Sequence, residues 1–372
     1  MIVNADLHIH SCYSIATSRD MLPENILNGC KTKGISVIGS GDALHPGWRR
    51  LWEETAVPEG ITVIPQTEVE DIKRVHHVIL METFEQFAAL QEKLTPSCAH
   101  FATCGRPHVY LTGEQIADAV HECGGLIGPA HAFTPWTSLF ASYELPSDCY
   151  GEARLDFCEL GLSADSSYGA GIEEFAGVPF LTNSDAHSHH PTKLGREFTR
   201  LDVQSLSPAG VLDAIAKGRV VLNAGFFPEE GKYNRTACVR CFTQFSLEEA
   251  ERCRWKCPHD GGQIKLGVRE RAQKISTLER PPARPPYIKM IPLAEVIARV
   301  LHVANPGAKK VTALYERFIA AFGNEIAVLL EVPKEDLAAV SFEVADAVIM
   351  MREGRVKLFP GGGGKYGSFS FE

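Results

Sequence analysis

Short β-branched apolar runs recur through the first 225 residues, and nearly all of them end in Asp, Glu or His side chains. The runs are IVNADLH, ISVIGSGD, ITVIPQTEVE, HHVILM, LIGPAHA, DFCELG and PFLTNSDAH. Amphipathic helical stretches lie between several of them. This alternation is typical of an α/β protein in which helices cover parallel strands, either as an open doubly wound sheet or as a barrel. The periodicity leaves both architectures open.

Three of the intervening helices have recognisable ends. Pro23 opens one that Gly34 ends, Thr112 can cap a second, and Ser207 opens a third that Gly218 ends. Proline in the first turn and glycine after the last turn are the residues that helix termini prefer. We therefore predict helices at these three places.

The first run leads into an alternating series, in which Asp6, His8 and His10 are separated by Leu7 and Ile9. Side chains at every second position of a strand point to the same face. Imidazole is the commonest ligand of divalent metals in proteins, and a carboxylate can complete the ligand set. The series favours a metal site, although a solvent-facing edge strand shows the same alternation.

Further candidate ligands stand at the ends of the later runs. Each of them alone has an ordinary structural interpretation, such as a turn aspartate, a helix cap or a core histidine. Together they place metal-ligating side chains where α/β enzymes build their active sites, at the carboxyl ends of successive strands. The series comprises Asp42, His45, Glu68, His76, His77, His131, Asp185 and His187.

The motifs DLHIH, GDALH, PAHAF and NSDAHS, together with the isolated Glu68, resemble the successive motifs of the PHP superfamily. The resemblance implies an α/β fold of the distorted (βα)7 barrel type with two or three divalent ions, Zn, Mn or Mg. It implies one metal between His8, His10, Glu68 and Asp185; a second between Glu68, His131 and either His76 or His77; and a third at His187 with Asp42 or His45. Asp185, Glu68 and His187 are the expected catalytic residues.

One departure from the superfamily pattern concerns the third metal. Many members carry a further ligand a few residues after the first motif, where this chain has Ser14, Ile15 and Ala16. Occupancy of the third site is therefore left open. Clustered divalent ions lower the pKa of bound water and neutralise phosphoryl oxygens, so the ligand set indicates hydrolysis of a phosphoester.

Four of the eleven cysteines lie close together, whereas the other seven are scattered singly before residue 160. Cys238 and Cys241 form one close pair, and Cys253 and Cys257 form another. Two such pairs predict a structural Zn²⁺ site with four thiolates. The second pair is one residue wider than the common spacing, which leaves His259 as an alternative ligand.

Charge is distributed unevenly along the chain. Net charge is −13 over residues 1–225, +7 over 226–310 and −3 over 311–372. A basic segment beside an acidic metal site fits binding to the phosphates of a nucleic acid, although it is also compatible with a solvated face. The residues predicted to contact DNA are Arg240, Lys265, Arg269, Arg271, Lys309 and Lys310.

The order of segments over the whole chain resembles the endonuclease Q family. A PHP-like region is followed by a cysteine module running into GGQIKLGVRERA, and then by a segment with ANPGAKKV and GGGGKYG. We expect a catalytic barrel at 1–226, a basic zinc module at 227–280 and a helical DNA-binding domain at 281–372. The resemblance implies incision of DNA on the 5′ side of deaminated bases (uracil, hypoxanthine, xanthine) and at abasic sites.

Such an enzyme has to reach a base inside a duplex, which requires a pocket for a flipped nucleotide. Trp48, Phe133 and Trp136 stand near the ligand motifs and are candidates for its walls, or equally for apolar cover over the metal site. Archaeal relatives are associated with a sliding clamp. The tail KYGSFSFE does not match the usual glutamine-led clamp peptide, so that partner is not predicted.

Two other functions compete with DNA incision. A small-molecule phosphoesterase, similar to histidinol phosphatase, would use the same ligands. A non-catalytic nucleic-acid-binding protein with a decayed barrel would not need an intact set. We see neither a secretory leader nor an apolar run that could span a bilayer, and expect a cytoplasmic protein.

Overall fold

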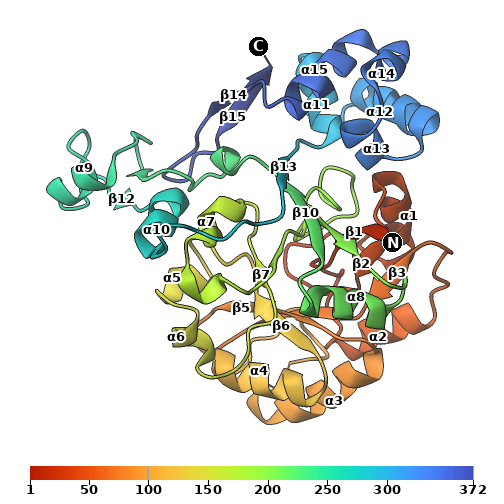
Figure 1. Ribbon diagram of the computed structural model, residues 1–372, viewed down its shortest axis with the longest axis vertical. Helices are drawn as coiled ribbons and strands as arrows, with labels where there is room; N and C mark the ends of the chain where they lie inside the picture. Colours follow the sequence, from red (N-terminus) through yellow and green to blue (C-terminus); the bar gives the residue numbers. More distant parts are fainter. Residues whose placement is uncertain (99, 372) are drawn as a thin grey trace.

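The computed structural model describes residues 1–98 and 100–371. It is an α/β protein in which helices surround a group of central strands (Figure 1). The strands of the first 225 residues are β1 (Ile2–Asp6), β2 (Val37–Gly39), β3 (Thr62–Ile64), β4 (Gln66–Glu70), β5 (His76–Leu80), β6 (Leu126–Pro129), β7 (Cys158–Glu159), β8 (Phe180–Leu181), β9 (Phe198–Asp202) and β10 (Val220–Gly225). The helices of this part are α1 (Pro23–Lys33), α2 (Pro46–Glu53), α3 (Phe84–Leu94), α4 (Gly113–Glu122), α5 (Leu139–Ser142), α6 (Ser147–Tyr150), α7 (Ser166–Ala170) and α8 (Pro208–Ala216).

The three helix ends read from the sequence are confirmed. Gly34 follows α1 with φ 92°, a left-handed conformation that glycine adopts without strain. Thr112 caps α4 in a capping box with Gln115, and Ser207 accepts a hydrogen bond from the backbone N–H of Gly210 at the start of α8. These ends depend on local side-chain chemistry, which is why the sequence alone predicts them.

The sheets are mixed, so the expectation of uniformly parallel strands is wrong. The largest sheet has the order β13-β10-β9-β1-β2-β3, in which β9 runs antiparallel to both β1 and β10. Strands β4, β5 and β6 form a separate antiparallel sheet, and β7 pairs with β8 in parallel. The run ITVIPQTEVE divides at Pro65, because β3 belongs to the first sheet and β4 to the second.

Residues 226–280 form a small module with few buried apolar side chains. It contains β11 (Ala237–Cys238), α9 (Leu247–Arg252), β12 (Ile264–Lys265) and α10 (Val268–Ile275). Its own apolar cluster has only four buried members, two of which are cysteines. Such a cluster is too small to hold a fold by burial alone.

The last part of the chain, after β13 (Tyr287–Lys289), is mainly helical. Its helices are α11 (Leu293–Val300), α12 (Lys309–Phe322), α13 (Glu325–Leu330), α14 (Lys334–Val340) and α15 (Phe342–Arg352). They lie at one end of the molecule beside α1, and their apolar faces share a continuous core with Ile26 and Leu27 of that helix (Figure 1).

Three strands in residues 281–372 were not predicted. Strand β13 (Tyr287–Lys289) follows the proline-rich segment and pairs in parallel with β10. Strands β14 (Val356–Phe359) and β15 (Ser368–Phe371) form an antiparallel hairpin. The glycine turn of this hairpin binds the module, because Arg235 donates a backbone hydrogen bond to Gly361 and Gly364 donates one to Lys232.

Within the described residues, no helix is both long enough and apolar enough to cross a membrane.

Candidate metal centre

Two loops that are distant in sequence are held together at the ends of β1 and β8. Ile9 and Ala186 form a parallel bridge, and the backbone N–H of His10 donates to the carbonyl of Ala186 at 3.0 Å. Asp6 lies behind them and accepts hydrogen bonds from Ser184, rather than facing the same site as the two histidines. Its role is therefore to position the second loop.

His8, His10 and Asp185 form the first group of candidate ligands. The Nε2 atom of His10 lies 3.1 Å from Oδ1 of Asp185, and that of His8 lies 3.7 Å from the same oxygen. Both histidines are fully buried, whereas the carboxylate is partly exposed. Their ligand atoms lie within 4.8 Å of one another, close enough to share one ion.

Glu68, His76 and His131 form the second group. Oε1 of Glu68 lies 2.9 Å from Nδ1 of His76 and 3.0 Å from Nε2 of His131. The other oxygen, Oε2, faces the first group and lies 3.4 Å from Nε2 of His10. One buried carboxylate therefore stands between the two groups, which is a suitable position for bridging two ions.

The alternation of β5 determines which of its two histidines joins this centre. His76 and Glu68 point to the same face of the β4–β5 pair, whereas His77 points to the other. There His77 Nδ1 lies 2.7 Å from the hydroxyl of Tyr150, and Nε2 lies 3.4 Å from Asp71 Oδ2. Cys149 lies beside this pair.

Two further candidate ligands, Asp42 and His45, have protein partners. Asp42 lies 3.3 Å from Nδ1 of His10 and accepts hydrogen bonds from Ser11 and Ser14, so it holds His10 from behind. His45 caps α2 by accepting a hydrogen bond from the backbone N–H of Trp48. Ser14 thus occupies the position where a further ligand was sought, and it bonds to Asp42.

His187 lies at the mouth of the centre. Its ring is 4.4 Å from that of His10 between centroids, and its side chain is 32% exposed. Its Nδ1 lies 3.0 Å from the backbone carbonyl of Asp185. It is the most accessible imidazole of the group.

Three of the candidate residues have left-handed backbone conformations, with φ of 41° at Asp42, 34° at His131 and 47° at Asp185. Such conformations are costly for residues other than glycine and cluster at functional sites, where the surrounding structure enforces them. Each of these residues follows a strand at a sharp turn. The turns aim His131 and Asp185 into the centre and place Asp42 behind His10.

Sequence reasoning missed several supporting residues. Glu159 in β7 lies 2.8 Å from Nδ1 of His8 and accepts a hydrogen bond from the backbone of His131. Arg106 places a guanidinium nitrogen 3.1 Å from Glu68, and Glu70 lies 3.2 Å from Nε2 of His76. The only sign of Glu159 in the sequence was its position near the end of the apolar run DFCELG.

Carboxylates outnumber fixed cations in the centre, and this excess of negative charge shifts the pKa values of its side chains. Burial alone would lower the pKa of His8, but Glu159, Asp185 and Glu68 raise it to about 9. Burial alone would raise the pKa of Asp185, but the neighbouring histidines hold it far below its usual range. The centre therefore attracts positive charge.

The unpaired atoms in the centre fit a metal ion. The Nε2 atoms of His8 and His10 are buried and make no well-aligned hydrogen bond within the described residues, although Asp185 Oδ1 lies 3.1 Å from that of His10. Buried polar atoms without partners are costly, and a cation would satisfy these two. The other ring nitrogen of each histidine faces a carboxylate, as in most histidine-ligated metal sites.

The cysteine module contains a separate group of candidate ligands. Cys238, Cys241, Cys257 and Asp260 bring their ligand atoms within 4.8 Å of one another. Cys253, predicted from the sequence as the fourth ligand, is not part of this group, and neither is His259. Cys253 instead ends α9 and packs against the small apolar cluster of the module.

Two solved structures match the whole chain. The crystal structure of the lesion-specific endonuclease PfuEndoQ from Pyrococcus furiosus superposes with a TM-score of 0.95 and 43% identity, covering 100% of this chain and 96% of that one. The chain belongs to the endonuclease Q family. An endonuclease Q in complex with a 27-mer duplex, which has an abasic lesion at the active site, gives a TM-score of 0.94 and 42% identity, covering 100% of this chain and 97% of that one.

Other relatives of this endonuclease Q family member are found by sequence. YqxK of Bacillus subtilis is 30% identical over 400 aligned positions, covering 98% of each chain. MJ0043 of Methanocaldococcus jannaschii is 42% identical over 266 residues, which are 69% of this chain and 32% of MJ0043. The present chain thus spans about a third of that relative. The MJ0043 C-terminal domain family matches residues 292–355, which hold α11 to α15.

As a member of the endonuclease Q family, the chain is an enzyme of the nuclease type. Only one of the three aromatic residues predicted for a base pocket is accessible. Trp48 and Phe133 are buried in apolar core, whereas Trp136 is 58% exposed. Trp136 lines a pocket of about 600 Å³ together with Thr134, whose hydroxyl lies 3.2 Å from Nδ1 of His131.

The six basic residues predicted to bind DNA differ in their surroundings. Arg240, Lys309 and Lys310 are exposed. Lys265 is half-buried, and its ammonium lies 3.2 Å from the ring centroid of Trp136. The remaining two have protein partners, because Arg269 lies beside Glu270 and Arg271 donates a hydrogen bond to the carbonyl of Phe140.

Proposed function

We propose that this protein is a DNA-repair endonuclease that hydrolyses the phosphodiester on the 5′ side of deaminated bases, namely uracil, hypoxanthine and xanthine, and at abasic sites. The products would be a 3′-hydroxyl and a 5′-phosphate. The observation that carries the proposal is the full-length similarity to an endonuclease Q bound to a duplex with an abasic lesion. The converging histidines and carboxylates of the metal centre support it.

Two groups of side chains would hold the metal ions. His8, His10 and Asp185 would bind one, and Glu68, His76 and His131 a second, with Glu68 between them. A third ion would require His187 with Asp42 or His45. Divalent ions such as Zn²⁺, Mn²⁺ or Mg²⁺ supply a hydroxide at neutral pH and neutralise the charge of the phosphoryl oxygens.

The chain's own residues would orient the ligands and the substrate. Glu159 and Asp42 hold the far nitrogens of His8 and His10, which fixes the ring orientations. Arg106 is 31% exposed and is suited to bind a phosphate oxygen beside Glu68. His187 at the mouth would contact the phosphate or the leaving oxygen.

The pocket of about 600 Å³ next to the centre would receive the displaced nucleotide. Its walls combine the aromatic rings of Trp136, Tyr233 and Phe226 with cationic side chains, including Lys232 and Arg196. Aromatic walls stack on a base and cations bind its phosphates, so the lining suits a flipped nucleotide. A weakly paired or missing base lowers the cost of flipping.

We propose a division of labour along the chain. Residues 1–226 would form the distorted PHP barrel and catalyse hydrolysis, 227–280 would be a metal-stabilised module, and 281–372 would bind the duplex. The +7 charge of residues 226–310 would make DNA affinity fall as salt concentration rises.

A denaturing gel of end-labelled duplexes tests the proposal. The duplexes carry uracil, hypoxanthine, xanthine, an abasic site or no lesion, and each is incubated with Mg²⁺, Mn²⁺, Zn²⁺ or a chelator. We expect metal-dependent incision at the lesions and none in the undamaged duplex. Hydrolysis of histidinol phosphate without incision of any duplex would identify a small-molecule phosphoesterase instead.

A further inference from the structure

Two turns of the cysteine module have the same backbone geometry. In the first, the N–H of Phe242 donates to the carbonyl of Cys238 at 3.1 Å, and in the second the N–H of Gly261 donates to that of Cys257 at 2.9 Å. The residue that closes each turn has a left-handed conformation, with φ of 60° and 69°. The two turns therefore present their first and fourth residues in the same way.

The fourth residues of these turns are different. In the first turn it is Cys241, and in the second it is Asp260. Cys257-x2-Asp260 thus repeats the spacing of Cys238-x2-Cys241, whereas Cys253 lies outside both turns. By position, Asp260 is the partner of Cys257.

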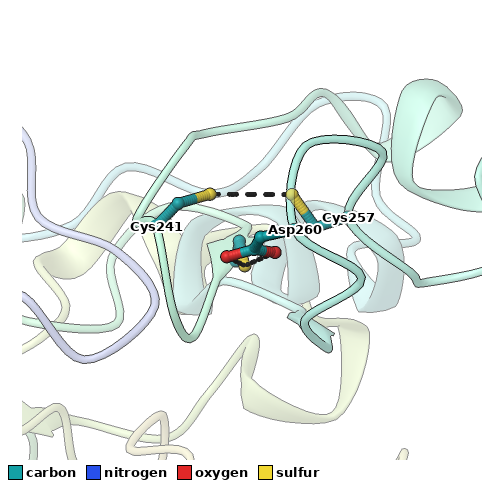
Figure 2. Close-up of side chains that lie close together, drawn as sticks. Cys241, Cys257 and Asp260 are labelled. Atoms are coloured by element: carbon teal, nitrogen blue, oxygen red, sulfur yellow. Dashed lines mark hydrogen bonds between the residues drawn. The ribbon is translucent and has the colours of Figure 1, made fainter.

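The distances between the four side chains match a tetrahedral metal site. Zn–S bonds of ~2.3 Å and Zn–O bonds of ~2.0 Å put two sulfurs about 3.8 Å apart, and a sulfur and an oxygen about 3.5 Å apart. The Sγ atoms of Cys241 and Cys257 are 3.6 Å apart (Figure 2). Cys238 Sγ is 3.4 Å from Asp260 Oδ1. The sulfur pair is too widely spaced to be a disulfide.

Gly262 holds the carboxylate in this position. Its N–H donates a hydrogen bond of 2.8 Å to Oδ1 of Asp260. A Cβ atom at Gly262 would come within 2.8 Å of Cys238 Sγ and 2.9 Å of the same oxygen, so the turn needs a residue without a side chain. The backbone at Gly262 therefore packs closely against both Cys238 Sγ and the carboxylate of Asp260.

We propose that the module binds a structural Zn²⁺ through three thiolates and one carboxylate, from Cys238, Cys241, Cys257 and Asp260, and that Cys253 is not a ligand. The four ligands leave no open position, so the ion is structural. It holds a module that has very few buried apolar side chains. This inference concerns a site separate from the metal centre and does not depend on the proposed nuclease activity.

Cobalt substitution in the full-length protein tests the ligand set. The thiolate-to-cobalt charge-transfer band scales with the number of sulfur ligands, and the nitrogen and oxygen ligands of the metal centre do not contribute to it. We expect Asp260→Cys to increase the band by about a third and Cys241→Ser to decrease it by about a third, because the wild type has three thiolates. Cys253→Ser is the matched control and should leave the band unchanged.

Metal affinity gives a second measurement. Asp260→Asn should keep the thiolate band at saturation but release the ion to a competing chelator at concentrations at least ~10-fold lower, because a charged ligand is lost. The proposal is overturned if Cys253→Ser weakens the band, if Asp260→Asn has normal affinity, or if the wild type shows no thiolate band.

Discussion

The Nδ1 atom of His8 lies 2.8 Å from Oε2 of Glu159, and both side chains are fully buried. Glu159 also accepts the backbone N–H of His131, so a single carboxylate supports both groups of candidate ligands. The contact orients the ring of His8 and leaves Nε2 facing Glu68 and Asp185.

Removing the charge of Glu159 should therefore weaken metal binding. We expect Glu159→Gln to lower affinity for the divalent ion by roughly 10- to 100-fold, as is usual when a group that orients a histidine ligand is lost. Titrating metal into the chelated protein, with incision as the second readout, measures the change. Glu152→Gln on the surface is the control, and equal affinities in the two variants would refute this role.

Loss of a ligand should abolish incision but spare DNA binding. Asp185→Ala removes the carboxylate next to His10, and we expect the incision rate to fall by roughly two to three orders of magnitude, because bound ions supply several kcal/mol to the transition state. Chelation of wild-type protein should have the same effect. Gel-shift affinity for a lesion duplex should change less than about threefold, and a parallel loss of affinity would contradict the proposed division of labour.

The sequence predicts those features of the fold that depend on local chemistry. Pro23 and Gly34 mark helix ends through their own backbone preferences, and Thr112 does so through a capping box with Gln115, so only residues close in sequence matter. Strand direction is different, because alternation is the same in parallel and antiparallel strands. The antiparallel direction of β9 and of the β4–β6 sheet could therefore not be predicted from the sequence.

For the metal centre, too, the sequence predicts what depends on residue type but not what depends on three-dimensional packing. Residue type and strand ends could indicate His8, Glu68 and His131, because metal ligands are chemically distinctive. The aromatic residues of the base pocket were chosen because they lie near ligand motifs in the sequence. Such proximity does not show whether a ring is exposed, and Trp48 is buried. Choosing Cys253 by residue type also left out Asp260, whose carboxylate lies in the group with Cys238, Cys241 and Cys257.

A buried ion pair joins the helical part to the rest of the protein. Lys33 of α1 lies 2.7 Å from Glu325 of α13, and Glu325 also accepts hydrogen bonds from Tyr315 and the backbone of Leu293. We expect Glu325→Ala to lower the free energy of unfolding by about 3–5 kcal/mol, because it leaves a buried ammonium without its counter-ion.

The matched comparison for this pair is the double variant Lys33→Met with Glu325→Leu. It removes both charges, so it should be more stable than Glu325→Ala alone. Urea denaturation followed by circular dichroism provides the values. A double variant that is less stable than the single one would show that the ion pair itself contributes most of the energy.

Stability should also depend on the ionisation of Glu197. Burial raises its pKa to about 8, and its Oε2 atom has no hydrogen-bond partner among the described residues. Between about pH 4.5 and 8 the unfolded chain releases this proton while the folded protein keeps it, so stability falls as pH rises through this window. Glu197→Gln removes the effect, and its stability relative to the wild type should increase from pH 5 to pH 8.5. Thermal unfolding at both pH values measures this, and a constant difference would refute it.

Trp136 connects the metal centre with the cysteine module. Its ring is exposed, lies under the ammonium of Lys265 at 3.2 Å and lines pockets on both sides. If a displaced nucleotide stacks there, Trp136→Ala should weaken binding to a lesion duplex by roughly 5- to 150-fold, the range given by ~1–3 kcal/mol per stacked base. Binding to an undamaged duplex should change much less, because no nucleotide is displaced.

Trp48→Phe provides the control for this prediction. Trp48 is buried and donates a hydrogen bond to the carbonyl of Ser40, so its replacement should lower stability while leaving DNA affinity intact. Fluorescence anisotropy with both duplexes separates the two effects. Equal losses on damaged and undamaged DNA in Trp136→Ala would assign the ring to general backbone contacts, and the nucleotide pocket would then have to lie elsewhere.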